Sequence, residues 1–354
     1  MKLCKDRIAC VQRFYDIGTY KWTSPIDFYA DRFIENTTVK CFYEKGKTYY
    51  GLPYSFHNKV KLADFKESIG KLSVDTVLGT DCIFAIFDAL GIEEETLLAF
   101  HSLDLLCGRT YAKPLGNITI LPDTVKHFTG VRNFTVTDIY EAFCQAKPGD
   151  IIVTYFNKKD VGFVGHVRLI TGFPVIVKDD TGRINPQKSY IPLSECRSTF
   201  TDSKDMSNFG INCQTIVPAE FKQELTDIRD FSELEGKNTN FIFNKKYSFY
   251  MLYNQYVHNF NVYCVPMRMV MFEEKEAIYS EVCNILREIK PNINLDKNGS
   301  FMEENILDSL EFFSLVASLS EKFKITLNFD DLSFKQFQTA ETITELVLRK
   351  QKEK

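Results

Sequence analysis

The hydrophobic positions near the C-terminal end of the chain follow a helical spacing. Apolar side chains recur every three to four residues in the segments 274–290, about 309–324 and about 340–350. In the first two segments they form the stripes Ile278, Val282, Ile285, Leu286 and Ile289, and Phe312, Leu315, Val316, Leu319 and Phe323. Pro291 ends the first helix, and a mostly polar loop follows it. We therefore expect a small helical bundle in this region.

The first 200 residues have a different pattern. A compact apolar run from Asp81 to Leu90 predicts a helix. Further along, runs of apolar and β-branched residues at 150–155, 165–170 and 175–177 predict strands, separated by turns that contain Gly and Pro. Helices followed by antiparallel strands indicate an α+β domain.

These patterns divide the chain into three parts. Residues 1–200 are the α+β domain, and residues 272–354 are the helical domain. Residues 201–271 leave two possibilities open. Their aromatic run from Phe241 to Tyr263 either adds strands to the first domain or forms a small domain of its own.

Composition and charge narrow the class of protein. The chain has 354 residues, of which 44% are hydrophobic and 25% are charged, as in ordinary globular domains. Residues 273–354 hold 16 acidic and 11 basic residues, a net charge of −5, whereas the remainder carries +1. The sequence has no basic stripe, so we expect no nucleic-acid partner.

The cysteines and the hydropathy indicate the compartment. The ten cysteines include no Cys-x-x-Cys pair, which argues against a zinc ribbon or a thioredoxin-type site, and we expect no metal site. The N-terminal residues lead into no apolar signal region, and no apolar run is long enough for a membrane span. We therefore expect a cytoplasmic protein with reduced thiols.

Ser309 opens the second helix of the bundle, within the sequence Ile-Leu-Asp-Ser-Leu at 306–310. One interpretation is an ordinary N-cap, since Asp and Ser both satisfy main-chain N–H groups at a helix start. The whole segment 274–354 favours another: an acidic helical domain with Asp-Ser-Leu at its second helix resembles the acyl and peptidyl carrier protein family. A phosphodiester at this place would face main-chain N–H groups and the positive end of the helix dipole.

The carrier resemblance implies a structure, a cofactor and partners. It implies an all-α four-helix domain with 4′-phosphopantetheine attached covalently to Ser309. It also implies two partners, a phosphopantetheinyl transferase and an enzyme that loads an acyl or aminoacyl group. Glu311 and Glu321 on the same helix would then face basic partner enzymes, and the alternative is an ordinary solvated helix face.

Cys82 and His166 are a candidate catalytic pair. Cys82 begins the predicted helix after Asp81, and a helix N-terminus lowers the pKa of a thiol below its ordinary value. His166 lies at the start of a predicted strand, where a base can face a nucleophile on a helix end. The alternative is a buried structural cysteine and an unrelated histidine.

The order of motifs extends this pair to a family resemblance. Gly-Leu-Pro-Tyr at 51–54, Asp81-Cys82, Pro-Gly-Asp-Ile at 148–151 and Gly-His-Val at 165–167 follow one another along the chain. This order resembles the NlpC/P60-like branch of papain-like cysteine hydrolases. The resemblance implies a helix-borne cysteine packed on an antiparallel sheet.

The same resemblance assigns roles to single residues. Cys82 would be the nucleophile, His166 the base, and Tyr54 a residue near the oxyanion. A polar residue on the strand after the histidine would orient it, and we favour Asp179 over Asp180. The alternative for these two aspartates is a turn, since Asp-Thr-Gly at 180–182 is turn sequence.

The two halves together predict chemistry on acyl groups held by sulfur. A papain-like cysteine and a carrier thiol both form thioesters, so we expect thiol-dependent acyl transfer or hydrolysis of an acyl substrate, in the biosynthesis of a metabolite or modified peptide. The enzyme would be an amidase, a thioesterase or an amide-forming transferase. In the alternative, the N-terminal domain is an inactive docking scaffold for the carrier. Ile83, where the family has Ser, and His57-Asn58, where it has two glycines, keep this alternative open beside the leading enzyme hypothesis.

Overall fold

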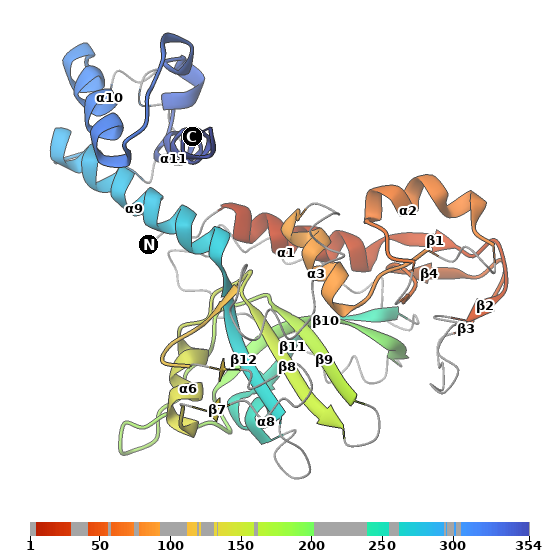
Figure 1. The fold of residues 1–354 in the computed structure, drawn as a ribbon. Helices are drawn as coiled ribbons and strands as arrows, with labels where there is room; N and C mark the ends of the chain where they lie inside the picture. Colours follow the sequence, from red (N-terminus) through yellow and green to blue (C-terminus); the bar gives the residue numbers. More distant parts are fainter. Residues whose placement is uncertain are drawn as a thin grey trace. The chain divides into compact units, whose positions relative to one another are not determined.

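The computed structural model describes residues 5–29, 42–55, 58–73, 78–92, 112–118, 120–121, 131–132, 134–158, 162–201, 239–254, 262–293, 295, 301 and 306–353. The chain is an α+β protein with two compact units, Met1–Val270 and Met271–Lys354, each of which is described by itself (Figure 1). Of the helices within the described ranges, none has the length and apolar character needed to cross a membrane.

The N-terminal unit is built on an eight-stranded sheet with the order β1-β4-β11-β10-β9-β8-β12-β5. Neighbouring strands are antiparallel except β4 and β11, which are parallel. The strands of this sheet are β1 (Lys21–Thr23), β4 (Thr48–Tyr50), β5 (Ala112–Pro114), β8 (Ile151–Lys158), β9 (Gly162–Ile170), β10 (Tyr190–Thr201), β11 (Thr239–Ser248) and β12 (Val262–Met269). Two small ribbons join β2 (Phe28–Tyr29) to β3 (Phe42–Tyr43), and β6 (Ile120–Leu121) to β7 (Val131–Arg132).

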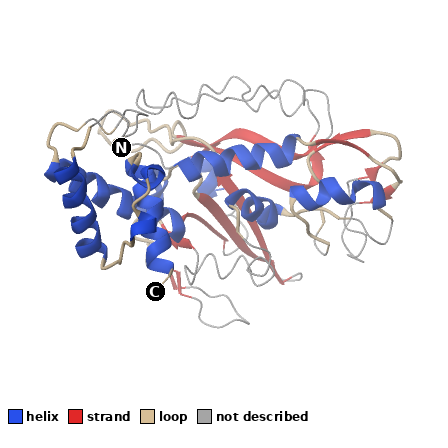
Figure 2. Ribbon diagram, turned by 90° about the horizontal axis from the view of Figure 1, so that it is seen from above, coloured by secondary structure: helices blue, strands red, loops and turns tan. Residues whose placement is uncertain are grey.

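Helices of this unit pack on the sheet. α1 (Lys5–Thr19) contacts both α3 (Cys82–Leu90) and β11, and α3 in turn contacts β9 and β10. Figure 1 shows α1 and α3 beside these strands, and in Figure 2, seen from above, helices of this unit lie over part of the red sheet. The other helices among the described residues of this unit are α2 (Leu62–Ser68), the short 3₁₀ helix η1 (Ile69–Lys71), α6 (Val136–Cys144) and α8 (Phe249–Asn254). α6 contacts α8 and β12.

The strand predictions were right for two of the three runs. Residues 151–155 of the first run and the whole run 165–170 lie in β8 and β9, which pair antiparallel along their length, whereas Asp150 precedes β8. The run 175–177 forms no strand, because Val175 makes only an isolated bridge to Tyr190. The sheet also takes β11 and β12 from the region after residue 201, so the aromatic run there supplies strands to the first unit.

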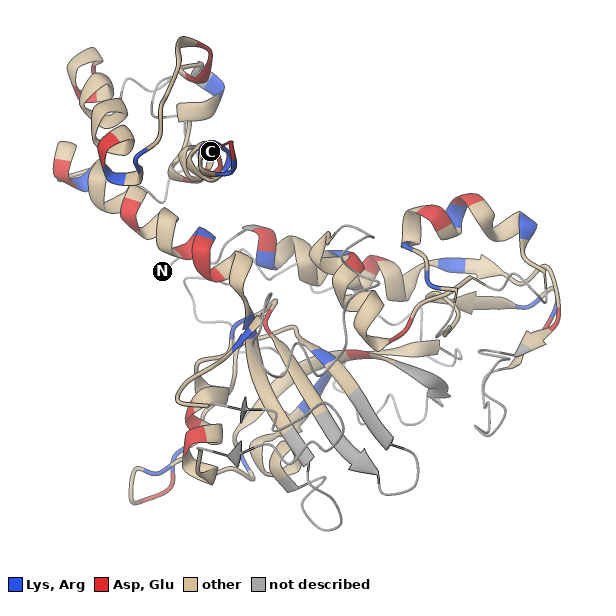
Figure 3. Cartoon of the chain, in the orientation of Figure 1, with Lys and Arg blue, Asp and Glu red and all other residues tan. Residues whose placement is uncertain are grey.

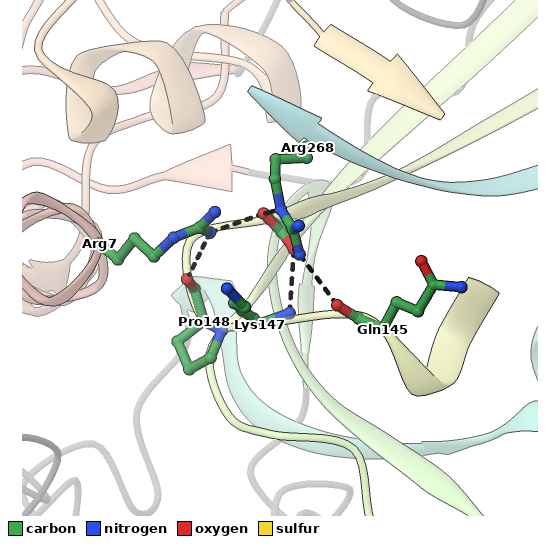
Figure 4. A network of polar contacts seen from close by, with 6 residues as sticks. Arg7, Gln145, Lys147, Pro148 and Arg268 are labelled. Atoms are coloured by element: carbon green, nitrogen blue, oxygen red, sulfur yellow. Dashed lines mark hydrogen bonds and ion pairs between the residues drawn. The ribbon is translucent and has the colours of Figure 1, made fainter. Parts of the chain in front are cut away.

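Asp150 in the Pro-Gly-Asp turn holds three segments of this unit together (Figure 4). Its carboxylate is fully buried and accepts from Arg7 on α1 at 2.6 Å and from Arg268 on β12 at 2.9 Å. The main-chain amide of Lys147 also donates to it, at 3.0 Å. Arg7 further donates to the carbonyl of Pro148. The Pro-Gly-Asp turn, one of the motifs in the sequence resemblance, therefore has a structural role here, because Asp150 forms ion pairs that join it to α1 and β12.

Replacing Asp150 with asparagine should destabilise the fold. The change removes the negative charge between two arginines, of which Arg7 is fully buried. Leaving a buried charge without its counterion costs about 3–5 kcal/mol. Urea unfolding followed by circular dichroism measures this loss, with the exposed Asp180→Asn as the matched control. Equal midpoints for the two variants would contradict the structural role of Asp150.

The C-terminal unit is a helical bundle. It contains α9 (Val270–Ile289), α10 (Ser309–Phe323) and α11 (Ala340–Lys352), with two 3₁₀ helices, η4 (Phe329–Asp331) and η5 (Phe334–Phe337). The helical bounds agree with the predicted segments to within four residues. Both predicted stripes face the core: Val282, Ile285, Leu286, Leu315 and Leu319 are buried, and the other stripe residues pack against them. Acidic residues outnumber basic ones along α9, with five of the first and two of the second (Figure 3).

Candidate functional site

The first candidate site lies at the start of α3, where two segments meet Cys82. Asp81 is the N-cap of α3, and its carboxylate accepts from the amides of Ile83 and Phe84. The segment that carries Tyr54 lies parallel to Thr80, because the amides of Ser55 and Thr80 donate to the carbonyls of Thr80 and Pro53. Glycine is required next to this contact, since a Cβ on Gly79 would lie 2.3 Å from the Pro53 carbonyl oxygen.

The Cys82 thiol contacts two of the elements that the sequence singled out. The Tyr54 hydroxyl hydrogen-bonds to it, and the main-chain amide of Val167 donates to Sγ. Val167 follows His166 on β9, so the structure brings the nucleophile candidate to the strand of the candidate base. Tyr54 is itself buried, and this burial together with the nearby Cys82 raises its pKa well above 10, so its hydroxyl stays neutral and donates.

The expected lowering of the Cys82 pKa is wrong. Burial, and next the neighbouring Asp81 carboxylate, raise the pKa of the thiol to about 12. The Val167 amide, the ammonium of Lys59 and the Tyr54 hydroxyl act in the opposite direction without outweighing burial. The dipole of α3 cannot compensate, because Asp81 already occupies the N-terminal amides and adds a negative charge. Cys82 is therefore a protonated thiol at neutral pH, and it needs a base to become a nucleophile.

Alkylation kinetics test this protonation state. A raised pKa depletes the thiolate at neutral pH, so Cys82 should react slowly with iodoacetamide at pH 7.5, and its rate should rise about tenfold per pH unit toward pH 11. The half-buried Cys144 serves as the internal comparison and should react faster at pH 7.5. Peptide mass spectrometry gives both rates. Rapid, pH-independent labelling of Cys82 would instead show a resting thiolate.

His166 is held by a buried carboxylate. Its Nε2 lies 2.6 Å from Oε2 of Glu195 on β10, which is fully buried. The same carboxylate accepts from Arg168 Nε at 2.8 Å and from the Tyr247 hydroxyl at 2.5 Å. An ionised carboxylate can only accept hydrogen bonds, so Nε2 of His166 carries the proton of this bond. In the neutral ring, Nδ1 then has the lone pair that accepts a proton.

Asp179 lies elsewhere. Its carboxylate closes its own turn by accepting from Thr181 N, Thr181 Oγ1 and Arg183 N, at 2.9, 2.6 and 3.0 Å. These hydrogen bonds, that of the Thr181 side chain first, lower the pKa of this exposed side chain. The carboxylate at His166 is therefore that of Glu195 and not that of Asp179. The turn, which was the alternative interpretation of 179–182, describes Asp179.

The second candidate site is the start of α10 in the C-terminal unit. The N-cap is Asp308, which accepts from Glu311 N at 2.8 Å, while the Glu311 carboxylate accepts from Asp308 N at 2.8 Å. Ser309 is the first helical residue, and its side chain is exposed. Since Asp308 performs the capping, the hydroxyl of Ser309 is not used for that purpose. An exposed hydroxyl at a helix N-terminus is suited to bear a phosphodiester such as that of phosphopantetheine.

Glu311 has a structural role at this site. Besides closing the capping box, its carboxylate accepts from Lys290 Nζ at 3.1 Å, and the same ammonium also donates to the Ile306 carbonyl. These bonds tie the loop before Ser309 to the segment just after α9. Glu321 is exposed, as expected for a solvated or partner-facing residue.

Comparison with known proteins leaves the family open. No family model, curated protein or solved structure matches the chain. Function must therefore be argued from the two sites. Within the described ranges, no group of three or more His, Cys, Asp or Glu side chains is arranged to hold a metal ion.

Sequence reasoning missed Glu195 although a signal was present. Glu195 continues the alternation of Ile191 and Leu193, whose side chains are fully buried. A charged residue at an inward position of a strand must be paired, so this one pointed to a buried polar partner. Arg168 is a similar case, because it interrupts the otherwise apolar strand 167–170.

Proposed function

We propose that the chain catalyses acyl transfer or hydrolysis through Cys82, and that its C-terminal unit is an acyl carrier modified at Ser309. One observation supports the catalytic half above the others. The Cys82 thiol hydrogen-bonds to Tyr54 and to the main-chain amide of Val167, which follows His166 on β9, and the imidazole of His166 is held by Glu195. Nucleophile, oxyanion donor, base and orienting carboxylate are thus supplied by four separate segments.

The residues carry out the reaction in two stages. Sγ of Cys82 attacks the carbonyl carbon of an acyl thioester while its proton passes to Nδ1 of His166. The carbon–sulfur bond to the leaving thiol breaks, and His166 returns the proton to that thiol. Water or an amine then attacks acyl-Cys82, again giving its proton to His166, and Cys82 leaves as a thiol. Tyr54 donates a hydrogen bond to the negatively charged oxygen in both stages.

The C-terminal unit has residues that fit a carrier. Ser309 would hold phosphopantetheine through its hydroxyl, and the group would present acyl chains as thioesters. Asp308 and Glu311 keep the helix start formed by capping each other's amides. Lys290 fixes the preceding loop to the segment after α9. None of these hydrogen bonds uses the Ser309 hydroxyl.

The docking scaffold remains the second candidate, and one observation favours it. Cys82 is 6% exposed and its pKa is about 12, which describes an inert thiol unless His166 acts on it. In that case the N-terminal unit would position the carrier for other enzymes without reacting itself.

An acyl adduct on Cys82 decides between the two. The full chain is incubated with short-chain acyl thioesters of N-acetylcysteamine, quenched in acid and digested for peptide mass spectrometry. We expect an acyl group on the Cys82 peptide. Cys10 is the internal control, because burial also raises its pKa to about 12. Acylation of neither cysteine, or of both equally, would reject the catalytic proposal and favour the scaffold.

A further inference from the structure

The Glu195 carboxylate is the centre of a buried polar cluster in the N-terminal unit. Three side chains reach it from two strands, His166 and Arg168 from β9 and Tyr247 from β11. Glu195, Tyr247 and Arg168 are 0%, 0% and 3% exposed, so bulk water cannot replace these bonds. The protonation state of this carboxylate therefore depends on its protein neighbours.

Arg168 is held so that it faces the carboxylate. Its NH1 donates to Thr154 Oγ1 at 2.8 Å, and Thr154 lies opposite His166 in the β8–β9 pair. The guanidinium also lies over the Tyr247 ring, 5.3 Å from the ring centroid. These contacts leave Nε directed at Oε2 of Glu195, the same oxygen that His166 approaches. Arg168 thus supplies a positive charge next to the carboxylate at a fixed geometry.

The state of Glu195 controls which nitrogen of His166 carries the proton. A carboxylate beside a guanidinium stays ionised and accepts from Nε2–H. A buried carboxyl group that loses such a cation takes up a proton and becomes a donor. A donor facing Nε2 requires the other tautomer, in which Nδ1 carries the proton. That tautomer cannot accept the proton of Cys82 through Nδ1.

We infer that Arg168 and Tyr247 are positioning residues that keep Glu195 a hydrogen-bond acceptor and thereby hold His166 as the Nε2–H tautomer. They act through Glu195, with Arg168 supplying charge and Tyr247 occupying the second oxygen as a donor. This inference rests on the proposed function only in taking His166 as the base for Cys82.

Nitrogen NMR of the full chain tests the inference without any substrate. The protein is labelled with [¹⁵N]histidine, and long-range ¹H–¹⁵N spectra distinguish Nδ1–H from Nε2–H in each of the five histidines. His166→Gln assigns the His166 signals. In the unmodified sequence, at a pH where the ring is neutral, we expect the Nε2–H pattern. An Nδ1–H pattern there would overturn the inference.

Substitution of Arg168 gives the sharper result. Arg168→Met removes the charge, and we expect the tautomer ratio to invert in favour of Nδ1–H, whereas Arg168→Lys keeps the charge and should keep Nε2–H. Arg287→Met, an exposed arginine on α9, is the matched control and should leave the ratio unchanged. A folded Arg168→Met variant that keeps Nε2–H would overturn the inference. If that variant does not fold, Tyr247→Phe decides, because a ratio equal to that of the original chain would then overturn it.

The kinetic consequence separates this inference from the proposed function. Since a misplaced proton disables the base, kcat for acyl turnover in Arg168→Met should fall about 100-fold, with little change in KM. An unaltered kcat in a variant whose tautomer has switched would overturn the positioning role. Absence of turnover in the original chain would instead reject the proposed function, while the tautomer result would still stand on its own.

Discussion

Acyl turnover is expected to disappear when Cys82 is replaced by alanine. Without Sγ no acyl-enzyme forms, and the rate should fall to that of the uncatalysed reaction. His166→Ala should remove the base and lower kcat about 10²–10⁴-fold. Both changes are assayed by release of free thiol from an acyl thioester. Thermal unfolding checks that each variant is folded, since Cys82 lies in the core of the N-terminal unit and His166 is partly buried.

Substitutions of the Glu195 and Asp179 carboxylates provide the matched comparison for this experiment. Glu195→Gln should lower kcat about 100-fold, because the amide no longer fixes the proton of His166. Asp179→Asn should leave it unchanged, since Asp179 bonds only within its own turn in the contacts described above. Turnover that survives in Cys82→Ala would reject Cys82 as the nucleophile. A loss in Asp179→Asn equal to that in Glu195→Gln would restore Asp179 as the orienting residue.

Ser309 is expected to be the only residue that a phosphopantetheinyl transferase modifies. Incubation with coenzyme A should add one phosphopantetheine per chain, and Ser309→Ala should add none. The hydroxyl is exposed and Asp308 caps the helix, so Ser309→Ala should unfold at the same temperature as the original chain. Asp308→Ala should lower the free energy of unfolding by about 1 kcal/mol, because it removes the helix cap. Intact-mass spectrometry measures the modification and calorimetry the stability.

Ser314→Ala is the control for the modification. Ser314 is also exposed and lies on α10, but its hydroxyl donates to the Leu310 carbonyl inside the helix. This variant should be modified as fully as the original chain. An original chain that gains no mass, or a Ser309→Ala variant that does, would reject the carrier proposal.

Local sequence was sufficient to predict the elements that bear the candidate residues. The helical period located α9, α10 and α11, because a helix that packs one face on a core must repeat apolar residues every three to four positions. Asp81 before an apolar run marked the start of α3, and runs of apolar and β-branched residues bounded by turns with Gly and Pro located β8 and β9. The association of Cys82 with Tyr54 was expected from the order of motifs, and the structure brings these two residues into contact.

The tertiary structure decided the features that depend on neighbours distant in sequence. Glu195 comes 29 residues after His166 and Tyr247 a further 52, and no local pattern states which strands lie side by side. The pKa of Cys82 shows the same limit. The helix N-terminus is a local property and lowers it, whereas burial and Asp81 raise it to about 12. Sequence alone therefore determined which helices and strands carry the candidate side chains. The tertiary packing determined the charge and the hydrogen-bond partners of those side chains, because the desolvation of a group depends on the residues that the rest of the fold places around it.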